Sequence, residues 1–224
     1  MLYTQTVEPG TLELIKKLSA DPVFSNFHLV GGTALALQLG HRISIDIDMF
    51  SEKPFDAKVI VAHLKEKYLA EDLRFLTNGV WSSVNNIKVD IMSHQYPWLK
   101  PPQNIEGVKM VSAEDIAAMK INVIHGKGTR RKDFADIYFL LEKFSLNKIL
   151  DFYQQKYPDT NRVMAKASLL YTKELKNDIV EFIGELLTTR QINARIKLAV
   201  FDPDKIFESV ARKESKKKSK EQKS

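Results

Sequence analysis

The chain has 224 residues with 44% hydrophobic and 28% charged side chains, which is the composition of a globular protein with a core of normal size. The absence of Cys excludes disulfides, thiolate catalysis and Cys-based zinc sites. No apolar segment approaches the roughly 20 residues of a membrane-spanning helix, and MLYTQTVEPG does not resemble a secretory signal, so a cytoplasmic protein is expected.

The net charge of +6 is concentrated at the C-terminal end of the sequence. Residues 212–224 (RKESKKKSKEQKS) contain seven Lys or Arg and two Glu, so they account for five of the six excess positive charges. Such a run of like charge is typical of a disordered, solubilising tail, with an arm that touches nucleic acid as the less favoured alternative. The charge alone therefore does not predict RNA binding.

The first half of the sequence has the pattern of a mixed α/β domain. Helical periodicity predicts a helix over 11–20, and FHLVGG predicts a short buried strand that enters a glycine turn. A helical turn over 33–39 is expected to end at Gly40, and an amphipathic helix is expected over 56–70.

Two further segments alternate polar and apolar residues, as half-buried strands do. In 42–50 the apolar side chains alternate strictly with Arg42, Ser44, Asp46 and Asp48. Residues 74–92 predict two strands joined at Asn85-Asn86, because Asn tolerates the positive φ of a tight hairpin turn. The second of these strands has Ile87, Val89 and Ile91 on one face, with Lys88 and Asp90 on the other.

After a Pro-containing loop over 96–104, the pattern is helical throughout, and Ser112 with Asp115 resembles a capping box. Helices are predicted over 113–125, 133–144, 146–156, 161–175, 179–187 and 190–200. The expected fold class is α+β, with an α/β core over 1–110, a helical region over 111–211 and the basic tail over 212–224.

Asp46 and Asp48 form the first candidate site. Two residues apart on a strand, they point the same way with Cα atoms about 6.6–7 Å apart, close enough to share a hard cation. Mg²⁺ prefers oxygen ligands, and Asp90 is a candidate third carboxylate for a site of one or two metal ions. The alternative is a polar strand face with scattered Asp.

The turn Gly31-Gly32-Thr33 strengthens the metal interpretation. A strand, two glycines and the start of a helix let backbone N–H groups approach a phosphate at a positive helix end. Alone this pattern is usually just a turn, but it precedes the Asp46/Asp48 strand closely. The turn is therefore predicted to bind phosphate and the carboxylates to bind the metal.

Lys120 lies in the middle of the apolar stripe of its predicted helix, where an ammonium group is costly unless it is paired or reaches a polar cavity. A stem that snorkels to water is the alternative. Asp133 shares the apolar face of the next helix, where it could also cap, and Asp136 lies at the edge of that face. A Lys120–Asp133 pair beside bound phosphates would explain both residues.

These motifs together resemble the AbiEii/AbiGii toxin family of the DNA polymerase β-like nucleotidyltransferase superfamily. The resemblance covers most of residues 25–145 and rests on the order of GGTALALQLGHRISIDIDMF, KVDIM and SAEDIAAMKINVIHGKGTRRKDFADIYFLL. It implies a small mixed sheet flanked by helices, a nucleotidyltransferase core and a helical C-terminal region.

The resemblance also implies roles for individual residues. It assigns nucleotide binding to Gly31, Gly32, Thr33, Arg42 and Ser44. Its lysine motif matches Lys120 and its R-K/R-D element matches Arg131, Lys132 and Asp133. The expected catalytic residues are Asp46, Asp48, Asp90, Lys120 and Asp133, and the expected metal ligands are Asp46, Asp48 and Asp90, with Asp133 as the alternative to Asp90. Where relatives carry Arg ahead of that element, this chain has Lys127, which lacks the bidentate phosphate contact of Arg.

The implied function is Mg²⁺-dependent transfer of a nucleotide from an NTP to an acceptor, which is expected to be the 3′ end of an RNA such as tRNA. The resemblance also implies that the protein is the toxin of a toxin–antitoxin or abortive-infection system and has a cognate antitoxin. One alternative keeps the enzyme but changes the acceptor to a small-molecule or protein hydroxyl. Another is a non-catalytic nucleotide-binding module. The intact Asp46/Asp48 pair argues against this last interpretation, because a degenerate copy would be expected to lose a metal carboxylate first.

Overall fold

The computed structural model describes residues 1–126, 128–172, 179–184 and 186–208. Lys127, the end of the predicted helix 161–175 and the predicted tail 212–224 lie outside these residues. The chain divides into two compact units, Met1–Ile116 and Ala117–Ser224.

The first unit is built on a mixed seven-stranded sheet with the order β3-β4-β5-β2-β1-β7-β6. β2 pairs in parallel with β5 and β1 in parallel with β7, whereas the other neighbours are antiparallel. The strands are β1 (His28–Leu29), β2 (Ile47–Ser51), β3 (Glu71–Leu76), β4 (Gly79–Val84), β5 (Ile87–Ser93), β6 (Gln103–Ile105) and β7 (Val108–Met110).

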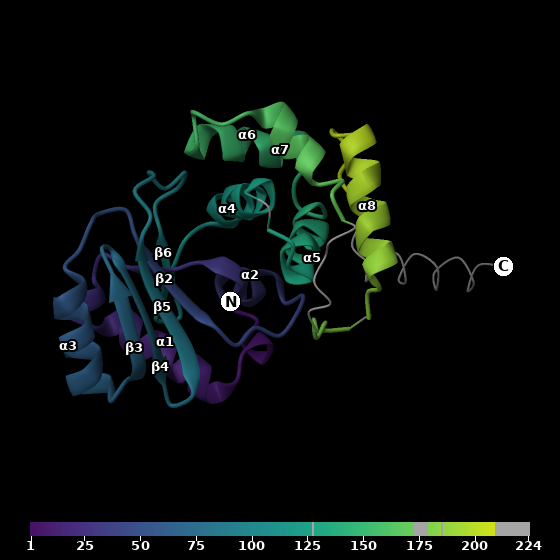
Figure 1. The fold of residues 1–224 in the computed structure, drawn as a ribbon. Coiled ribbons are helices and arrows are strands. Elements are labelled where there is room, and N and C mark those ends of the chain that lie inside the picture. The colour runs from purple at the N-terminus through teal and green to yellow at the C-terminus, as the bar shows by residue number, and fades with distance from the viewer. Residues whose placement is uncertain (127, 173–178, 185, 209–224) are drawn as a thin grey trace. The chain divides into compact units, whose positions relative to one another are not determined.

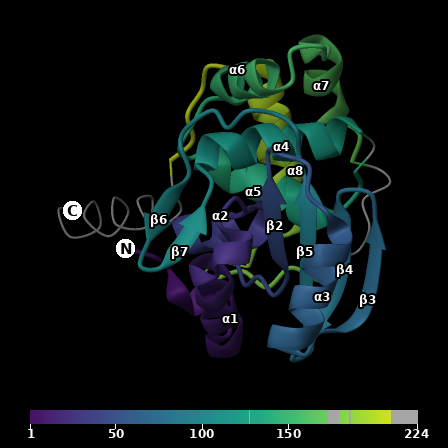
Figure 2. The same cartoon turned by 90° about the vertical axis from the view of Figure 1, so that its left-hand side faces the viewer.

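Three α-helices accompany the sheet: α1 (Pro9–Ala20), α2 (Gly31–Leu39) and α3 (Ala57–Tyr68). Short 3₁₀ turns, Thr4–Thr6 and Pro22–Phe24, flank α1 in the sequence. Figure 1 shows α3 and α2 on opposite sides of the strands, and Figure 2 shows α3 in front of the sheet, where it packs on β3 and β4. The predicted helices of this half are thereby confirmed.

The apolar sides of these elements form the core of the unit. Ile60 and Leu64 of α3 are buried, as are Val89 and Ile91 of β5, and burial of each such side chain contributes roughly 1.5–3 kcal/mol. The middle of α2 is buried on all sides, since Ala34–Leu37 are all fully buried. Gly40 ends α2 in the left-handed region with φ 71°, as predicted.

The predicted hairpin turn at Asn85-Asn86 is confirmed. Both residues have positive φ, 51° and 63°, as a type I′ turn requires, and the turn joins β4 to β5 with Val84 opposite Ile87. The segment before the turn holds two strands, however, because a tight turn at Asn78 (φ 61°) separates β3 from β4.

The prediction of one strand over 42–50 is wrong in its first half. β2 begins at Ile47, and the residues before it reverse the expected alternation: Arg42 and Ser44 are buried, whereas Ile45 is 61% exposed. The backbone N–H of Ser44 donates to Thr6 O at 2.8 Å and not to a neighbouring strand of the sheet. The short hairpin of β6 and β7 was also not predicted, because three-residue strands carry no readable period.

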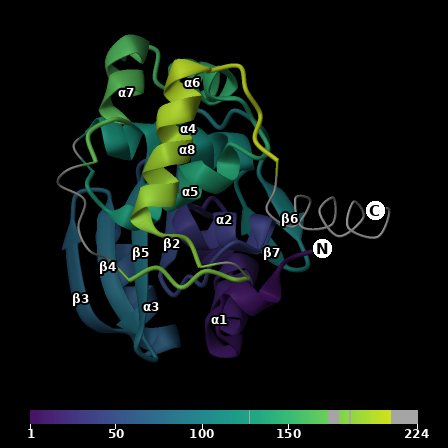
Figure 3. The same ribbon diagram turned by 90° about the vertical axis from the view of Figure 1, so that its right-hand side faces the viewer.

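The second unit is helical in its described parts. The helix α4 (Ala113–His125) begins in the last residues of the first unit and continues into the second, and it starts at the predicted capping residues, since Asp115 N–H donates to Ser112 Oγ at 3.1 Å. The other helices are α5 (Arg131–Leu140), α6 (Leu146–Lys156), α7 (Arg162–Ser168) and α8 (Thr189–Phe201). Figure 3 shows α8 packed against α5.

Side-chain caps explain where several of these helices begin. Ser145 caps α6, Asn161 caps α7, and Thr188 with Gln191 forms a capping box for α8. The predicted helix over 179–187 is wrong, because the described residues of that segment are irregular. In the described ranges, no helix is long and apolar enough to cross a membrane. The α+β fold class is confirmed, with strands in the first unit and helices in the second.

Candidate functional site

The predicted site residues fall into two groups, one in each unit. The first unit holds the predicted phosphate and metal residues, which are Gly31, Gly32, Thr33, Arg42, Ser44, Asp46, Asp48 and Asp90. The second unit holds Lys120 and Asp133. Each group is built from the elements of its own unit.

The pairing of β2 with β5 brings two of the predicted carboxylates together. Asp48 and Asp90 are Cα partners in this parallel pair, so their side chains leave the same face of the sheet side by side. Asp46 lies just before β2, and Asp90 is only 8% exposed. The apolar neighbours Ile47, Met49, Val89 and Ile91 are all fully buried, and they fix which face the carboxylates take.

Gly31 lies directly against Asp48. A Cβ at Gly31 would be 2.5 Å from Asp48 Oδ2, and the backbone there has φ 69°, which favours glycine. Gly31 is also the first residue of α2, a helix without a side-chain cap among the described residues. Backbone N–H groups at the start of α2 are therefore next to a carboxylate, which is where a phosphate and its cation would meet.

Thr33, Arg42 and Ser44 hold the segment that leads into β2. The Thr33 hydroxyl donates to the main-chain oxygen of Asp46 and lies 2.9 Å from Ser44 Oγ. A Cβ at Gly32 would collide with the Arg42 guanidinium, which donates to Ile43 O at 2.9 Å. Because all three side chains are buried, they connect the glycine turn to the carboxylates and fix the distance between the two.

Lys88 faces the carboxylates, and the sequence analysis gave it no role. Its ammonium donates to Asp90 Oδ2 at 2.6 Å. Partial burial opposes its charge, but the hydrogen bond to Asp90 and the negative charges of Asp90, Asp46 and Asp48 together raise the pKa of Lys88 above its ordinary value. The signal was present in the sequence, since Lys88 shares the polar face of β5 with Asp90.

The donor chemistry of this group fits a hard divalent cation. All the candidate ligands are carboxylate oxygens, and Asp90 Oδ1 is buried without a hydrogen-bond partner among the described residues. The carboxylates are not arranged as a preformed site, however: within the described ranges, no group of three or more His, Asp or Glu is placed to hold a metal ion.

In the second unit, the predicted Lys120–Asp133 pair is confirmed and extended. Lys120 Nζ lies 2.7 Å from Asp133 Oδ1 and 2.6 Å from Asp136 Oδ2, and both carboxylates are fully buried. Arg130 Nε lies 2.8 Å from Asp133 Oδ2. Two cations thus face two buried carboxylates. This pairing offsets the cost of placing the ammonium of Lys120 on the apolar face of its helix.

The sequence pattern did not predict that Asp136 and Arg130 belong to this cluster. Asp136 was placed only at the edge of its helix face, although the spacing of three residues from Asp133 puts both carboxylates on one side of α5. Arg130 directly precedes α5, and its side chain reaches forward to Asp133 in the first turn of that helix.

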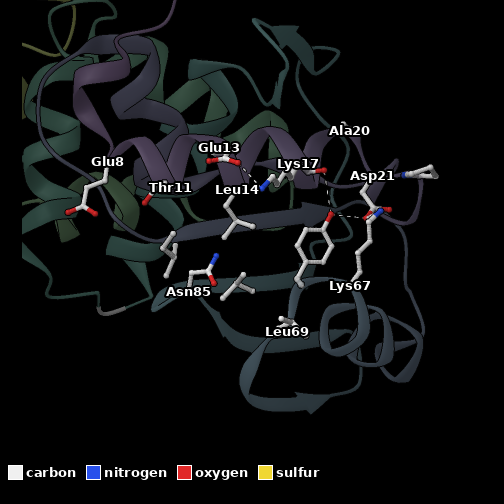
Figure 4. A pocket seen from close by; sticks show the side chains of 15 residues that line it. Glu8, Thr11, Glu13, Leu14, Lys17, Ala20, Asp21, Lys67, Leu69 and Asn85 are labelled. Atoms are coloured by element: carbon white, nitrogen blue, oxygen red, sulfur yellow. Dashed lines mark hydrogen bonds and ion pairs between the residues drawn. The ribbon is translucent and has the colours of Figure 1, made fainter.

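A separate pocket of about 790 Å³ lies in the first unit among α1, the end of α3 and the β4–β5 turn (Figure 4). None of the predicted site residues, all of which are described, lines it. At its edge the buried carboxylate of Asp21 accepts hydrogen bonds from His63 Nε2 at 2.8 Å and Tyr68 OH at 2.7 Å, and it lies 2.9 Å from Lys67 Nζ.

The Asp21 carboxylate is ionised by its partners. Burial opposes ionisation, but the hydrogen bonds from His63, Lys67 and Tyr68 outweigh it and hold the pKa of Asp21 well below its ordinary value. Burial raises the pKa of the Tyr68 hydroxyl above its ordinary value, and the hydrogen bond to Asp21 raises it further. This network joins the ends of α1 and α3 and has no part in the candidate site.

Comparison with known proteins supports the nucleotidyltransferase interpretation. The family model of the nucleotidyl transferase AbiEii toxin of type IV toxin–antitoxin systems matches residues 13–78 and 58–213. An uncharacterized protein of Aquifex aeolicus (strain VF5), aq_aa25, is 32% identical over 184 residues, which is 76% of this chain and 85% of the relative.

Two solved structures from Helicobacter pylori have a similar fold. A proposed nucleotidyltransferase has a TM-score of 0.52 and 16% identity, covering 88% of this chain and 96% of its own. The protein JHP933 has a TM-score of 0.50 and 16% identity, covering 97% of this chain and 98% of its own. These likenesses confirm the nucleotidyltransferase-like fold that the sequence motifs implied.

The match of the family model over most of the chain, on a fold that places a glycine turn against paired carboxylates, leads to one conclusion. The chain belongs to the nucleotidyl transferase AbiEii toxin family and is a nucleotidyltransferase.

Proposed function

We propose that the protein transfers a nucleotide from an NTP to the 3′ end of an RNA, with tRNA as the first candidate acceptor, in a reaction that depends on Mg²⁺. The observation that carries the proposal is the close approach of the glycine turn at the start of α2 to the carboxylates of β2 and β5. Gly31, at the start of α2, lies against Asp48, and Asp48 stands opposite Asp90 in the β2–β5 pair.

Each side chain of this group has a defined part in the proposal. Asp46, Asp48 and Asp90 would hold divalent metal ions, whose positive charge, when bound, neutralises the triphosphate and the charge that develops during transfer. Gly31 and Gly32 let backbone N–H groups approach phosphate oxygens, because neither residue has a Cβ in the way.

Positioning accounts for the remaining residues of the group. The Thr33 hydroxyl bonds to the backbone of Asp46 and to the Ser44 hydroxyl, and Arg42 packs against Gly32. These buried polar side chains fix the turn and the carboxylates relative to each other. Such positioning matters because phosphoryl transfer depends mainly on orientation and electrostatic stabilisation. Asp90, on the same strand face, is the candidate to accept the proton of the attacking hydroxyl.

Lys120 and Asp133 are proposed to be catalytic residues, as the family resemblance implies. Their buried pairing with Asp136 and Arg130 gives them a fixed geometry within the second unit. Because the chain belongs to the toxin family of a toxin–antitoxin system, a cognate antitoxin is part of the proposal.

The test is incubation of the purified protein with total tRNA, Mg²⁺ and each α-labelled NTP in turn. Label on RNA is expected with the wild-type protein and is expected to disappear in Asp46→Asn. Asp72→Asn, which removes an exposed carboxylate from β3 of the same unit, is the matched control and should label RNA normally.

A lack of label with every NTP would contradict the RNA acceptor. Label on a protein or a small molecule would then identify the acceptor directly. Label on RNA that persists in Asp46→Asn would contradict the assignment of the carboxylates.

A further inference from the structure

Lys88 places a positive charge where the proposed metal site has its negative charges. It lies two residues before Asp90 on β5, so both side chains leave the same face of the strand. Its ammonium binds Asp90 Oδ2 at 2.6 Å, and it also interacts electrostatically with Asp46 and Asp48. Its ammonium is therefore hydrogen-bonded to one carboxylate of the site and lies in the electrostatic field of the other two.

The surroundings of Lys88 differ from those of an ordinary surface ion pair. An exposed Lys–Asp pair is screened by water and contributes little. Here Asp90 is 8% exposed, and its second oxygen, Oδ1, is buried without a hydrogen-bond partner among the described residues. Without Lys88, the buried carboxylate of Asp90 would lose its cation and would remain near two further negative charges, which is costly.

We propose that Lys88 is a built-in counter-ion of the carboxylate site, which it neutralises in the metal-free protein and from which a divalent cation must displace it. The inference rests on the proposed assignment of Asp46, Asp48 and Asp90 as metal ligands.

The Lys88 side chain can make room for a metal. It is 57% exposed, and its long stem can turn the ammonium toward water when a second cation repels it. The exchange has a cost, because the Lys88–Asp90 hydrogen bond must break before metal can bind Asp90 Oδ2. The nucleotide-free protein is therefore expected to bind a divalent cation weakly.

The test is a titration of the full chain with Mn²⁺ alone, without nucleotide and at low ionic strength, followed by electron paramagnetic resonance of the free ion. Lys88→Met is expected to bind Mn²⁺ about tenfold more tightly than wild type, because one nearby positive charge has been removed. Lys88→Arg keeps the charge and should bind as wild type does. Lys58→Met, which removes an exposed positive charge from α3, is the matched control.

A second measurement uses stability in the absence of metal. Lys88→Met should have a lower Tm than Lys58→Met in metal-free buffer of low salt, and Mn²⁺ should reverse the difference. Adding Asp46→Asn to Lys88→Met should abolish the tighter Mn²⁺ binding, which shows that the gain arises at these carboxylates.

Failure of the inference can be distinguished from failure of the proposed function. If wild type binds Mn²⁺ and loses it in Asp46→Asn, while Lys88→Met matches Lys58→Met, the metal site stands and the counter-ion role is overturned. If neither wild type nor Lys88→Met binds Mn²⁺, the metal assignment and the counter-ion role are both overturned. Tighter binding in Lys88→Met supports the role whatever the acceptor of the nucleotide is.

Discussion

Asp48 and Asp90 stand directly opposite each other on the parallel strands β2 and β5, although 42 positions separate them in the numbering of the chain. A parallel pair joined by a crossover places two distant carboxylates on one face with a register that the buried side chains fix. Like charges in such a position oppose folding slightly and favour the binding of a cation.

Asp48→Asn should therefore separate stability from activity. Removing one of several clustered negative charges is expected to leave the Tm of the metal-free protein unchanged or raised. Nucleotide transfer is expected to fall by roughly 100-fold or more, since charge stabilisation is lost in the reaction. Thermal unfolding and the labelling assay on the same preparation give both values, and a variant that is active but less stable would contradict this account.

Gly31→Ala should be far more harmful than Gly10→Ala. At Gly31 the added Cβ would meet Asp48 Oδ2 at 2.5 Å on a backbone with φ 69°, so Asp48 must move and the backbone is strained. At Gly10, in the first turn of α1, the added Cβ would meet no described atom within 4 Å. Nucleotide binding and labelling should fall strongly in the first variant and stay normal in the second, and equal effects would argue against close contact at Gly31.

Lys120→Met should destabilise the protein by roughly 3–5 kcal/mol, because Asp133 and Asp136 would remain buried without their shared cation. Urea unfolding measures the loss. Lys197→Met removes an exposed positive charge from α8 and should change stability by less than about 0.5 kcal/mol.

The contribution of Lys120 to turnover needs conditions in which the variant is folded. At low temperature and without urea, the labelling rate of Lys120→Met is expected to fall well below that of Lys197→Met. Equal rates in fully folded proteins would leave Lys120 with a structural role alone.

Asp21→Asn should destabilise the protein by about 2–3 kcal/mol at neutral pH, because hydrogen bonds from His63, Lys67 and Tyr68 to a charged acceptor are weakened. The folded state holds the pKa of Asp21 below its ordinary value of 3.8, so the stabilisation is complete above that value. It is lost as the pH falls below about 4, because the unfolded chain takes up the proton first.

Urea unfolding of wild type and Asp21→Asn at several pH values between 7 and 3 checks this dependence. The difference in unfolding free energy should be constant near neutral pH and should shrink in acid. Asp72→Asn is the control, and a difference for Asp21→Asn that does not vary with pH would contradict the role of its charge.

The parts of the fold that the sequence predicted best are those with local signals. The helix bounds 113–125 and 146–156 agree with α4 and α6, because apolar periodicity and capping residues such as Ser145 act within a few positions. The Asn85-Asn86 turn was predictable for the same reason, since its positive φ values depend on two adjacent residues.

The errors arose where distant contacts decide the structure. The alternation over 42–50 continues through Ser44, yet Ser44 and Arg42 are buried by Thr33 and Gly32 of α2 and are not part of β2. The same limit applies to the candidate site. The sequence placed Lys88 and Asp90 on one face of β5, but the position of Asp48 beside that face depends on the register of β2 with β5, which no local pattern reveals.

The crossover between β2 and β5 also indicates where the protein can be altered. The chain between these strands forms α3, β3 and β4, and β3 is an edge strand of the sheet. β3 is already irregular, with a bulge between Glu71 and Arg74, and most of its side chains are exposed. We therefore expect that a short affinity tag inserted at that bulge, or a fluorophore attached there, would leave the pairing of β2 with β5 unchanged. The bulge is a suitable position for labelling the active enzyme.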